Sequence, residues 1–401
     1  MSLLAHGVGS SSDLPLPLDL VLQAGAATVV LSFLIAAVLW TRPRLSGGTV
    51  RSSGTGGWIA VPQAIVLGLC LYLAGNALAG PRDATNPAAH ALFVWLWVGL
   101  VPLSVILGPV WRAVNPLRTL FRWLRLPRAG VRPADGLGAW PAVLWLLAFV
   151  WFELVAPHRT DPRVIGFGLV GYAIVQLGMA VLRGEEWFAR GDCFEVYSSL
   201  AGRLSPVRWR RPLTGLAAPF PVSSASLAAF VAVWWGSTVF DSASGSPAWA
   251  GFVQRAGHAE LYATGALVLV CAGVLLAVRG TAGRLDVTAS LIPIAVGYTL
   301  AHYLSLLIVE APRGFLLAIQ QWGLAPGAAW TVVPVPAAIA TAQVTLILVG
   351  HVLGVIVAHD AALSAVPSDR RPVLATLADE FPLVLFMIGC TWAGLFLLFV
   401  R

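Results

Sequence analysis

Two long apolar segments of this chain carry a histidine in their interiors. The segment at 287–309 contains His302, and the segment at 335–359 contains His351. Three more ionisable residues stand at the segment ends: Glu310, His359 and Asp360. An ionisable side chain at membrane depth is costly and usually has a function there. These residues therefore form the first candidate site.

The expected depth of each histidine limits what the pair can bind together. At 1.5 Å per residue, His302 lies ~22 Å and His351 ~12 Å from the inner ends of their helices. A shared metal ion would then require tilted or staggered helices. Tyr298, one turn inward of His302, is closer to the level of His351, so a Tyr298–His351 hydrogen bond is easier to form. Three roles stay open for the histidines: interhelical hydrogen bonds, a proton or solute pathway, and metal or haem ligation. The pathway would also include Gln343, His359 and Asp360.

A second group of candidate residues is expected near the outer surface. Glu153 and Glu310 each stand shortly before an Ala-Pro pair, and His158 follows Glu153 closely. Imidazole and carboxylate together suit zinc or a similar divalent ion, which can activate water. We predict Glu153 and Glu310 as catalytic residues and His158, His302 and His351 as metal ligands. Three further histidines are expected to face outward: His6, His90 and His258.

Several absences narrow the chemistry. The chain has no lysine and no P-loop, so we expect no nucleotide cofactor and no lysine Schiff base. The three methionines argue against a thioether-lined copper path. There is no HExxH or CxxC spacing, and the four scattered cysteines do not suggest a disulfide framework.

Composition places these residues in a membrane protein. The chain of 401 residues is 58% hydrophobic and 11% charged, whereas soluble domains are roughly 25% charged. Runs of about 20 apolar residues, the length that crosses a bilayer, recur along it. We predict an all-α, polytopic transmembrane helical bundle that forms a single domain over 1–401. Ten spans are expected, at 19–41, 58–80, 90–111, 138–157, 164–183, 223–240, 259–279, 287–309, 335–359 and 381–400.

The arginines predict the orientation. All 25 basic residues are Arg, and most fall in alternate loops, as the positive-inside rule requires if the N-terminus is outside. With ten spans both termini are outside, in the plasma membrane. Eight spans, or eleven with 212–222 re-entering the membrane, are the alternatives.

Two inner loops, at about 112–137 and 184–222, mix Arg with aromatic residues. We expect both loops to lie along the cytoplasmic membrane surface, with their arginines toward anionic headgroups. A docking site for a second protein subunit is the alternative. Interleaved basic and aromatic residues also occur in nucleic-acid binders, but beside ten spans we expect no nucleic-acid partner.

Five stretches in order along the chain resemble one family. They are LLAHGVG, GPVWRAVNPLRTLFRWL, GDCFEVYSSLAGRLSP, AHYLSLLIVE and GHVLGVIVAHD. The chain resembles the actinobacterial integral membrane proteins commonly named fenitrothion hydrolase. This resemblance implies a multi-pass protein that hydrolyses an organophosphate triester at the membrane, perhaps with a second component.

Three hypotheses about function follow. The first is a metal-assisted membrane hydrolase that acts on apolar phosphotriester-like substrates. The second is a proton-coupled transporter or permease that uses the intramembrane histidines, since histidine titrates near neutral pH. The third is a haem or redox membrane subunit with His302 and His351 as axial ligands. A structural subunit whose partner supplies the chemistry is a further alternative.

Overall fold

The computed structural model describes residues 13–14, 16–46, 48–50, 59–126, 136–220, 222–282, 286–365 and 373–399. Within these ranges the regular elements are helices, apart from one isolated antiparallel bridge between Val50 and Trp209. The predicted all-α class is therefore confirmed for the described residues. The chain divides into two compact units, and each is described by itself. Whether they form one transmembrane domain stays a prediction.

Unit 1 is formed mainly by Arg51–Arg208 and Leu306–Val333. Its longer elements are α2 (Ala60–Ala79), the π-helix η2 (His90–Val98), α3 (Leu100–Leu107), α5 (Pro116–Trp123), α6 (Trp140–Leu154), α7 (Pro162–Arg183), α9 (Cys193–Ala201) and most of α15 (Leu304–Gln320). Shorter helices connect them: α4 (Val110–Val114), η3 (Glu185–Trp187), α8 (Phe188–Gly191) and η4 (Gly202–Leu204).

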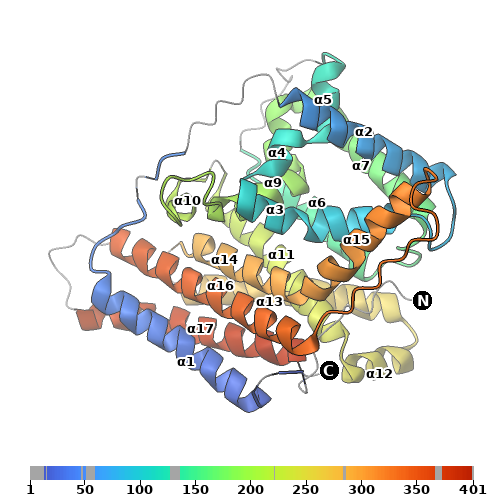
Figure 1. Ribbon diagram of the computed structural model, residues 1–401. Helices are drawn as coiled ribbons and strands as arrows, with labels where there is room; N and C mark the ends of the chain where they lie inside the picture. Colours follow the sequence, from blue (N-terminus) through green and yellow to red (C-terminus); the bar gives the residue numbers. More distant parts are fainter. Residues whose placement is uncertain are drawn as a thin grey trace. The chain divides into compact units, whose positions relative to one another are not determined.

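Unit 2 is formed mainly by Ala5–Val50, Trp209–Ser305 and Pro334–Arg401. Its helices are α1 (Leu18–Leu39), α10 (Thr214–Ala217), α11 (Ser224–Ser244), α12 (Pro247–Ala256), α13 (Ala259–Ala282), α14 (Thr288–His302), α16 (Pro336–Ser364) and α17 (Val373–Phe399). Helices α1, α14, α16 and α17 lie side by side (Figure 1), and α11 packs against both α13 and α14.

Local sequence explains several helix ends. Asn115 accepts hydrogen bonds from the first amides of α5, and Pro116 fills its first position, where no amide hydrogen is needed. Asp161 caps α7 in the same way, again before a proline. Helix α7 ends at Arg183, and the next residue, Gly184, has a positive φ of 87°, which glycine adopts at little cost.

Among the described residues, seven helices are long and apolar enough to cross a membrane, and α14 with α15 counts as an eighth if this bent pair is one span. Two of the ten predicted spans do not qualify. Helix α6 has 15 residues, fewer than the ~20 that a bilayer requires. Helix α11 is not among the candidates, and it is buried along most of its length. By length and hydropathy, the chain is a multi-pass helical membrane protein, with seven or eight candidate spans in the part that the structure describes.

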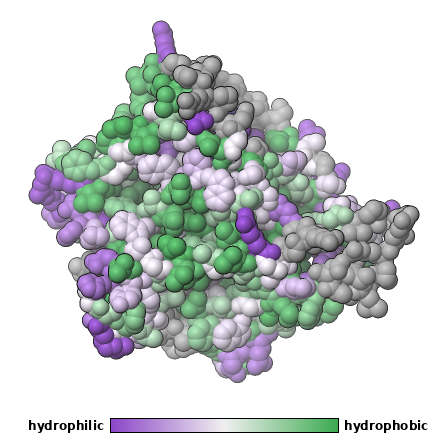
Figure 2. Space-filling model, turned by 180° about the vertical axis from the view of Figure 1, so that it is seen from behind, coloured by the Kyte–Doolittle hydropathy of each residue, from purple (hydrophilic) through white to green (hydrophobic). Residues whose placement is uncertain are grey.

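Exposed apolar side chains support the membrane setting. Figure 2 shows broad apolar areas on one face of the molecule. Large hydrophobic side chains are strongly exposed on the candidate spans, including Ile35 on α1, Phe167 on α7 and Leu269 on α13. Lipid tails can cover such apolar surfaces in a membrane, whereas soluble monomers rarely expose large apolar patches.

Helices α14 and α16 approach each other unusually closely. A Cβ at Gly350 would lie 2.6 Å from the carbonyl oxygen of Pro293, and one at Gly354 would lie 2.8 Å from that of Ser290. The later residue of α16, Gly354, meets the earlier residue of α14, Ser290, so the two helices are antiparallel. Small residues permit this backbone contact, as is common between helices in membranes.

Candidate functional site

A continuous chain of buried polar side chains lies inside unit 2. His302, the last residue of α14, places Nε2 2.9 Å from Oδ2 of Asp241 and Nδ1 2.9 Å from Oγ of Ser242, both on α11. The Ser242 hydroxyl lies 2.8 Å from that of Tyr298, one turn earlier on α14. Tyr303 follows the helix and donates its hydroxyl hydrogen to Asp241 Oδ2 at 2.9 Å. We refer to Asp241, His302, Ser242 and Tyr298 as the buried relay.

The buried relay is shielded from solvent. Asp241 is 7% exposed, and both Ser242 and His302 are 1% exposed. Beside the relay, the Trp234 indole of α11 donates to Thr299 Oγ1 of α14 at 3.0 Å. A buried charge or hydroxyl without partners would be strongly destabilising, so these contacts fix the rotation of α11 against α14.

The structure places His351 and Gln343 on α16, beside α14. Gln343 donates its amide hydrogen to the carbonyl of Ala301 at 2.9 Å. His351 Nδ1 lies 2.9 Å from the Ile347 carbonyl oxygen, and His351 Nε2 is buried without a hydrogen-bond partner. The predicted Tyr298–His351 hydrogen bond is therefore wrong. The Tyr298 hydroxyl meets Ser242 on α11, a helix that the sequence did not indicate as its neighbour.

The end of α16 carries a second buried imidazole–carboxylate pair. His359 Nδ1 lies 3.0 Å from Glu380 Oε2 on α17, and Nε2 lies 3.0 Å from the Trp40 carbonyl oxygen after α1. The next residue, Asp360, accepts hydrogen bonds from the Trp40 indole at 2.8 Å and from the Arg44 amide at 2.6 Å. These two predicted pathway residues therefore tie three helices together at one end of unit 2.

Glu310 contacts a histidine in unit 1. Its Oε2 lies 3.0 Å from Nε2 of His90, the first residue of the π-helix η2, and its Oε1 accepts from Arg313 at 3.4 Å. His90 is 2% exposed. Both His90 and Glu310 are predicted from the sequence to lie near the outer surface, and they meet in the structure. Longer π-helical turns are rare and are often found at functional sites.

The other two predicted residues of unit 1 occupy different environments. Glu153 is buried near the end of α6, whereas His158 is exposed in the following turn with a φ of 55°. Their catalytic and metal-binding roles stay predictions.

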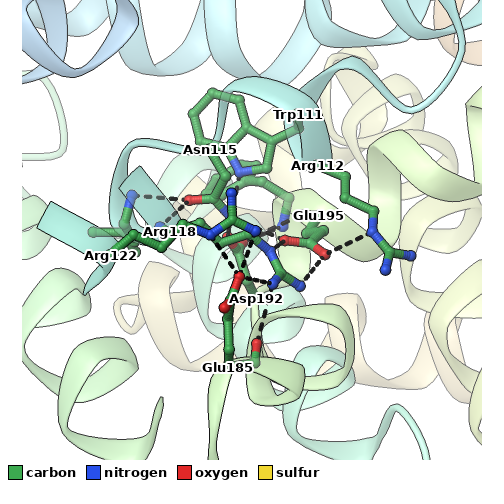
Figure 3. Close-up of polar contacts among 10 residues, drawn as sticks. Trp111, Arg112, Asn115, Arg118, Arg122, Glu185, Asp192 and Glu195 are labelled. Atoms are coloured by element: carbon green, nitrogen blue, oxygen red, sulfur yellow. Dashed lines mark hydrogen bonds and ion pairs between the residues drawn. The ribbon is translucent and has the colours of Figure 1, made fainter. Parts of the chain in front are cut away.

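The arginine-rich loops of unit 1 fold into a buried ionic network (Figure 3). Arg118 on α5 donates from Nε and Nη2 to the two carboxylate oxygens of Glu195 on α9, at 2.8 and 2.7 Å. Asn115 donates to Glu195 and also to Asp192 Oδ2, at 3.1 and 2.8 Å. The prediction that these arginines face lipid headgroups is therefore wrong for Arg118, which is 4% exposed.

Two arginines at the rim of this network remain accessible. The side chain of Arg112 is 53% exposed and that of Arg122 is 45% exposed. Arg122 Nε donates to Glu185 Oε1 at 2.8 Å. Although burial opposes it, Arg122 and then Arg118 lower the pKa of Glu185. The network thus has solvent-exposed arginines at its rim and a buried interior.

Asp192 is the most heavily bonded carboxylate in the network. It caps α9, where its Oδ1 accepts from the amides of Phe194 and Glu195, and Tyr172 donates to the same oxygen at 2.9 Å. Burial, and secondarily the charge of Glu195, raise the pKa of Asp192 to about 6. Asp192 therefore titrates closer to neutrality than an ordinary aspartate.

The sequence did not indicate three side chains that contact His302 and His359, which are Asp241, Ser242 and Glu380. Asp241 falls one residue beyond the predicted span 223–240, and Glu380 falls one residue before 381–400. Both were treated as loop residues at segment ends. Each of these acidic residues directly adjoins an apolar run. If the helix extends past the run, the acidic residue becomes a buried charge, and this could have been recognised from the sequence.

Among the described residues, no group of three or more His, Cys, Asp or Glu side chains is arranged to hold a metal ion. Both ring nitrogens of His302 already contact Asp241 and Ser242. His158 lies in unit 1, while His302 and His351 lie in unit 2. The metal and haem hypotheses gain no support from these contacts.

No protein-family model, curated protein or solved structure matches this chain.

Proposed function

We propose that this multi-pass membrane protein translocates protons, as part of a proton-coupled transport cycle, through the buried relay. The observation that carries the proposal is the unbroken sequence of hydrogen-bonding groups from Asp241 through His302 and Ser242 to Tyr298. Carboxylates, imidazoles and hydroxyls inside a helical bundle are the groups that carry protons in pumps and transporters.

The relay has two self-consistent hydrogen-bond arrangements. When Asp241 is ionised, His302 donates from Nε2 to Asp241, Ser242 donates to His302 Nδ1, and Tyr298 donates to Ser242. When Asp241 is protonated, every one of these bonds reverses, and the Tyr298 hydroxyl hydrogen then points away from Ser242. The two arrangements differ by one proton. The relay can therefore pass a proton between Asp241 and an acceptor beyond Tyr298.

The helix that carries His302 favours a transporter over a static subunit. Helix α14 ends at His302 and α15 begins at Leu304, so the helix is interrupted at Tyr303. Transporters commonly place their coupling-ion sites at such interruptions, where the backbone can rearrange. The ends of helices are also where small movements change hydrogen-bond partners with the least disruption of packing.

Potential-driven proton flux tests this function. Purified protein is reconstituted into liposomes that contain the pH dye pyranine, and valinomycin with a potassium gradient imposes the potential. We expect the wild type to acidify the interior and Asp241→Asn to lose at least 90% of this flux. Asp19→Asn, which alters an exposed carboxylate of α1 in the same unit, is the matched control. Wild-type liposomes that behave like empty ones would contradict the proposal.

Phosphotriester hydrolysis, which the family resemblance implies, is the second candidate. The Ser242–His302–Asp241 contacts favour it, because a base held by a carboxylate can activate a serine. Ser242 Oγ would attack phosphorus, His302 would take the hydroxyl proton, and an aryl oxide would leave. Water would then hydrolyse the phosphorylated Ser242, which releases a phosphodiester and restores the serine. The 1% exposure of Ser242 favours protons as the cargo, since a triester would require this site to open.

Nitrophenolate release from a p-nitrophenyl phosphotriester separates the two candidates. Hydrolysis that disappears in Ser242→Ala would support the hydrolase, whereas no release above buffer would exclude it. The metal-assisted version, with Glu153 and Glu310 at the reacting centre, predicts instead that a chelator abolishes activity and Ser242→Ala does not.

We further propose ten spans with both termini outside, in the plasma membrane. This arrangement requires α6 and α11 to cross the membrane within the bundle although they are not candidates by length and hydropathy. The distribution of arginine supports it. Anionic headgroups would meet exposed arginines such as Arg112 and Arg122, and a second subunit would also dock on this side.

A further inference from the structure

His351 lies in the interior of unit 2 with one ring nitrogen unpaired. Its Nδ1 lies 2.9 Å from the Ile347 carbonyl oxygen, and since a carbonyl only accepts, Nδ1 carries the hydrogen. The lone pair of the neutral ring is then on Nε2. This atom is buried without a hydrogen-bond partner, and the residue is 2% exposed. A buried polar atom of this kind calls for an explanation.

The packing of α14 against α16 places Tyr298 and His351 on the same side of the helix pair. Gly297 and Gly350 face each other across the antiparallel contact. Tyr298 and His351 each follow one of these glycines, and each is turned by ~100° from it. In an antiparallel pair these two turns lead to the same side. Helix α17 covers this side, where Gly394 meets the Tyr298 ring.

The two side chains also lean toward each other along the helix axis. Their Cα positions differ in level by ~6 Å, about one turn. Helical side chains point toward the N-terminus of their own helix. Because the helices run in opposite directions, Tyr298 leans toward the level of His351, and His351 toward that of Tyr298. The Ile347 contact, one turn before His351, agrees with this direction.

We infer that His351 Nε2 is the acceptor that takes the proton from Tyr298, through water between the two side chains. This inference rests on the proposed function and extends the relay by one residue. When Asp241 gives up its proton, the relay reverses and the Tyr298 hydroxyl hydrogen leaves toward the water. The water passes a proton to Nε2, which gives an imidazolium that still donates from Nδ1 to Ile347. One proton has then moved from Asp241 to His351.

His351→Gln is the central variant of the test. Glutamine can fill the space and form hydrogen bonds, but it cannot carry a proton. We expect at least a tenfold loss of the potential-driven flux in pyranine-loaded liposomes. His258→Gln, which changes an exposed histidine outside the helices, is the matched control and should retain wild-type flux. Thermal unfolding of each purified variant verifies that it is folded.

Asp241→Asn, measured in parallel, separates this inference from the function on which it rests. Loss of flux in both Asp241→Asn and His351→Gln supports the inference. Loss in Asp241→Asn with wild-type flux in His351→Gln overturns the inference and leaves the proposed function standing. Wild-type flux in Asp241→Asn overturns both. If His351→Gln does not fold, His351→Asn provides the same comparison with a shorter amide.

Discussion

His302 has a side-chain hydrogen-bond partner at each ring nitrogen, whereas His351 in the same unit has none at Nε2. Its contacts to Asp241 and Ser242 are both 2.9 Å. Neither nitrogen is available to a metal ion unless one of these bonds breaks. The ring can, however, exchange one tautomer for the other while both contacts persist. At the scale of single residues, these contacts suit proton transfer better than metal binding.

Two tyrosines beside His302 are expected to contribute differently. Tyr298→Phe removes the last hydroxyl of the buried relay, so proton flux should fall at least tenfold. Tyr303→Phe removes a donor to Asp241 but leaves the relay continuous. Loss of one such buried bond costs ~1–3 kcal/mol, so Tyr303→Phe should mainly lower the unfolding temperature. Equal fluxes in the two variants would contradict this assignment.

Arg118 and Arg122 provide a matched pair for stability in unit 1. Arg118→Ala leaves Glu195 buried without its two-pronged partner, and such a loss costs ~3–5 kcal/mol. Arg122→Ala removes an arginine whose side chain is 45% exposed, and exposed pairs contribute ~0–1 kcal/mol. Chemical unfolding in detergent should therefore show a large loss for Arg118→Ala only. Similar losses of stability in both variants would mean that the buried Arg118–Glu195 pair does not stabilise unit 1 more than the exposed arginine does.

Helix α9 depends on the carboxylate that caps it. The pKa of Asp192 is raised from the usual 3.8 to about 6. Between these values the folded protein holds a proton that the unfolded chain releases. Stability from this group is therefore complete below pH 3.8 and is lost as the pH rises through about 6.

Comparison with Asp192→Asn isolates this contribution from other titrating groups. The unfolding temperature of the wild type, measured relative to Asp192→Asn, should fall as the pH rises from 3.8 to about 6. A difference that stays constant over this range would mean that Asp192 does not titrate there in the folded protein.

The positions of the helices were predicted better than the contacts between them. Long apolar runs indicated α1, α7, α13 and α16 because hydropathy is a property of consecutive residues. Arg118 shows why contacts were harder. Its sequence neighbours are arginines and aromatic residues, typical of a membrane-surface helix, whereas its partner Glu195 lies 77 positions away. Only tertiary structure brings them together.

The candidate site was predicted in part for the same reason. Tyr298 and His302 were correctly grouped, since both lie on one face of one helix. The other half of the buried relay, Asp241 and Ser242, comes from α11, whose polar residues lie just beyond the span predicted from hydropathy. The helix continues to Ser244 because packing within unit 2 covers its polar end.

At the scale of the whole molecule, the orientation in the membrane can be tested independently of transport. In a variant without the native cysteines, Asp83→Cys should react with a membrane-impermeant maleimide in intact cells. Val207→Cys should react only after the membrane is permeabilised. Both positions are exposed, and the positive-inside rule places Asp83 outside and Val207 inside. The opposite labelling pattern would invert the proposed topology.

The reversal of the buried relay can be observed in the tautomer of His302. Histidine labelled with ¹⁵N reports which ring nitrogen carries hydrogen, and His302→Gln identifies the signals of His302 by their absence. Acidification should convert a neutral His302 protonated at Nε2 into a neutral His302 protonated at Nδ1, as the relay reverses. An imidazolium protonated at both nitrogens, or a single tautomer at every pH, would show that the relay does not reverse and would contradict the account.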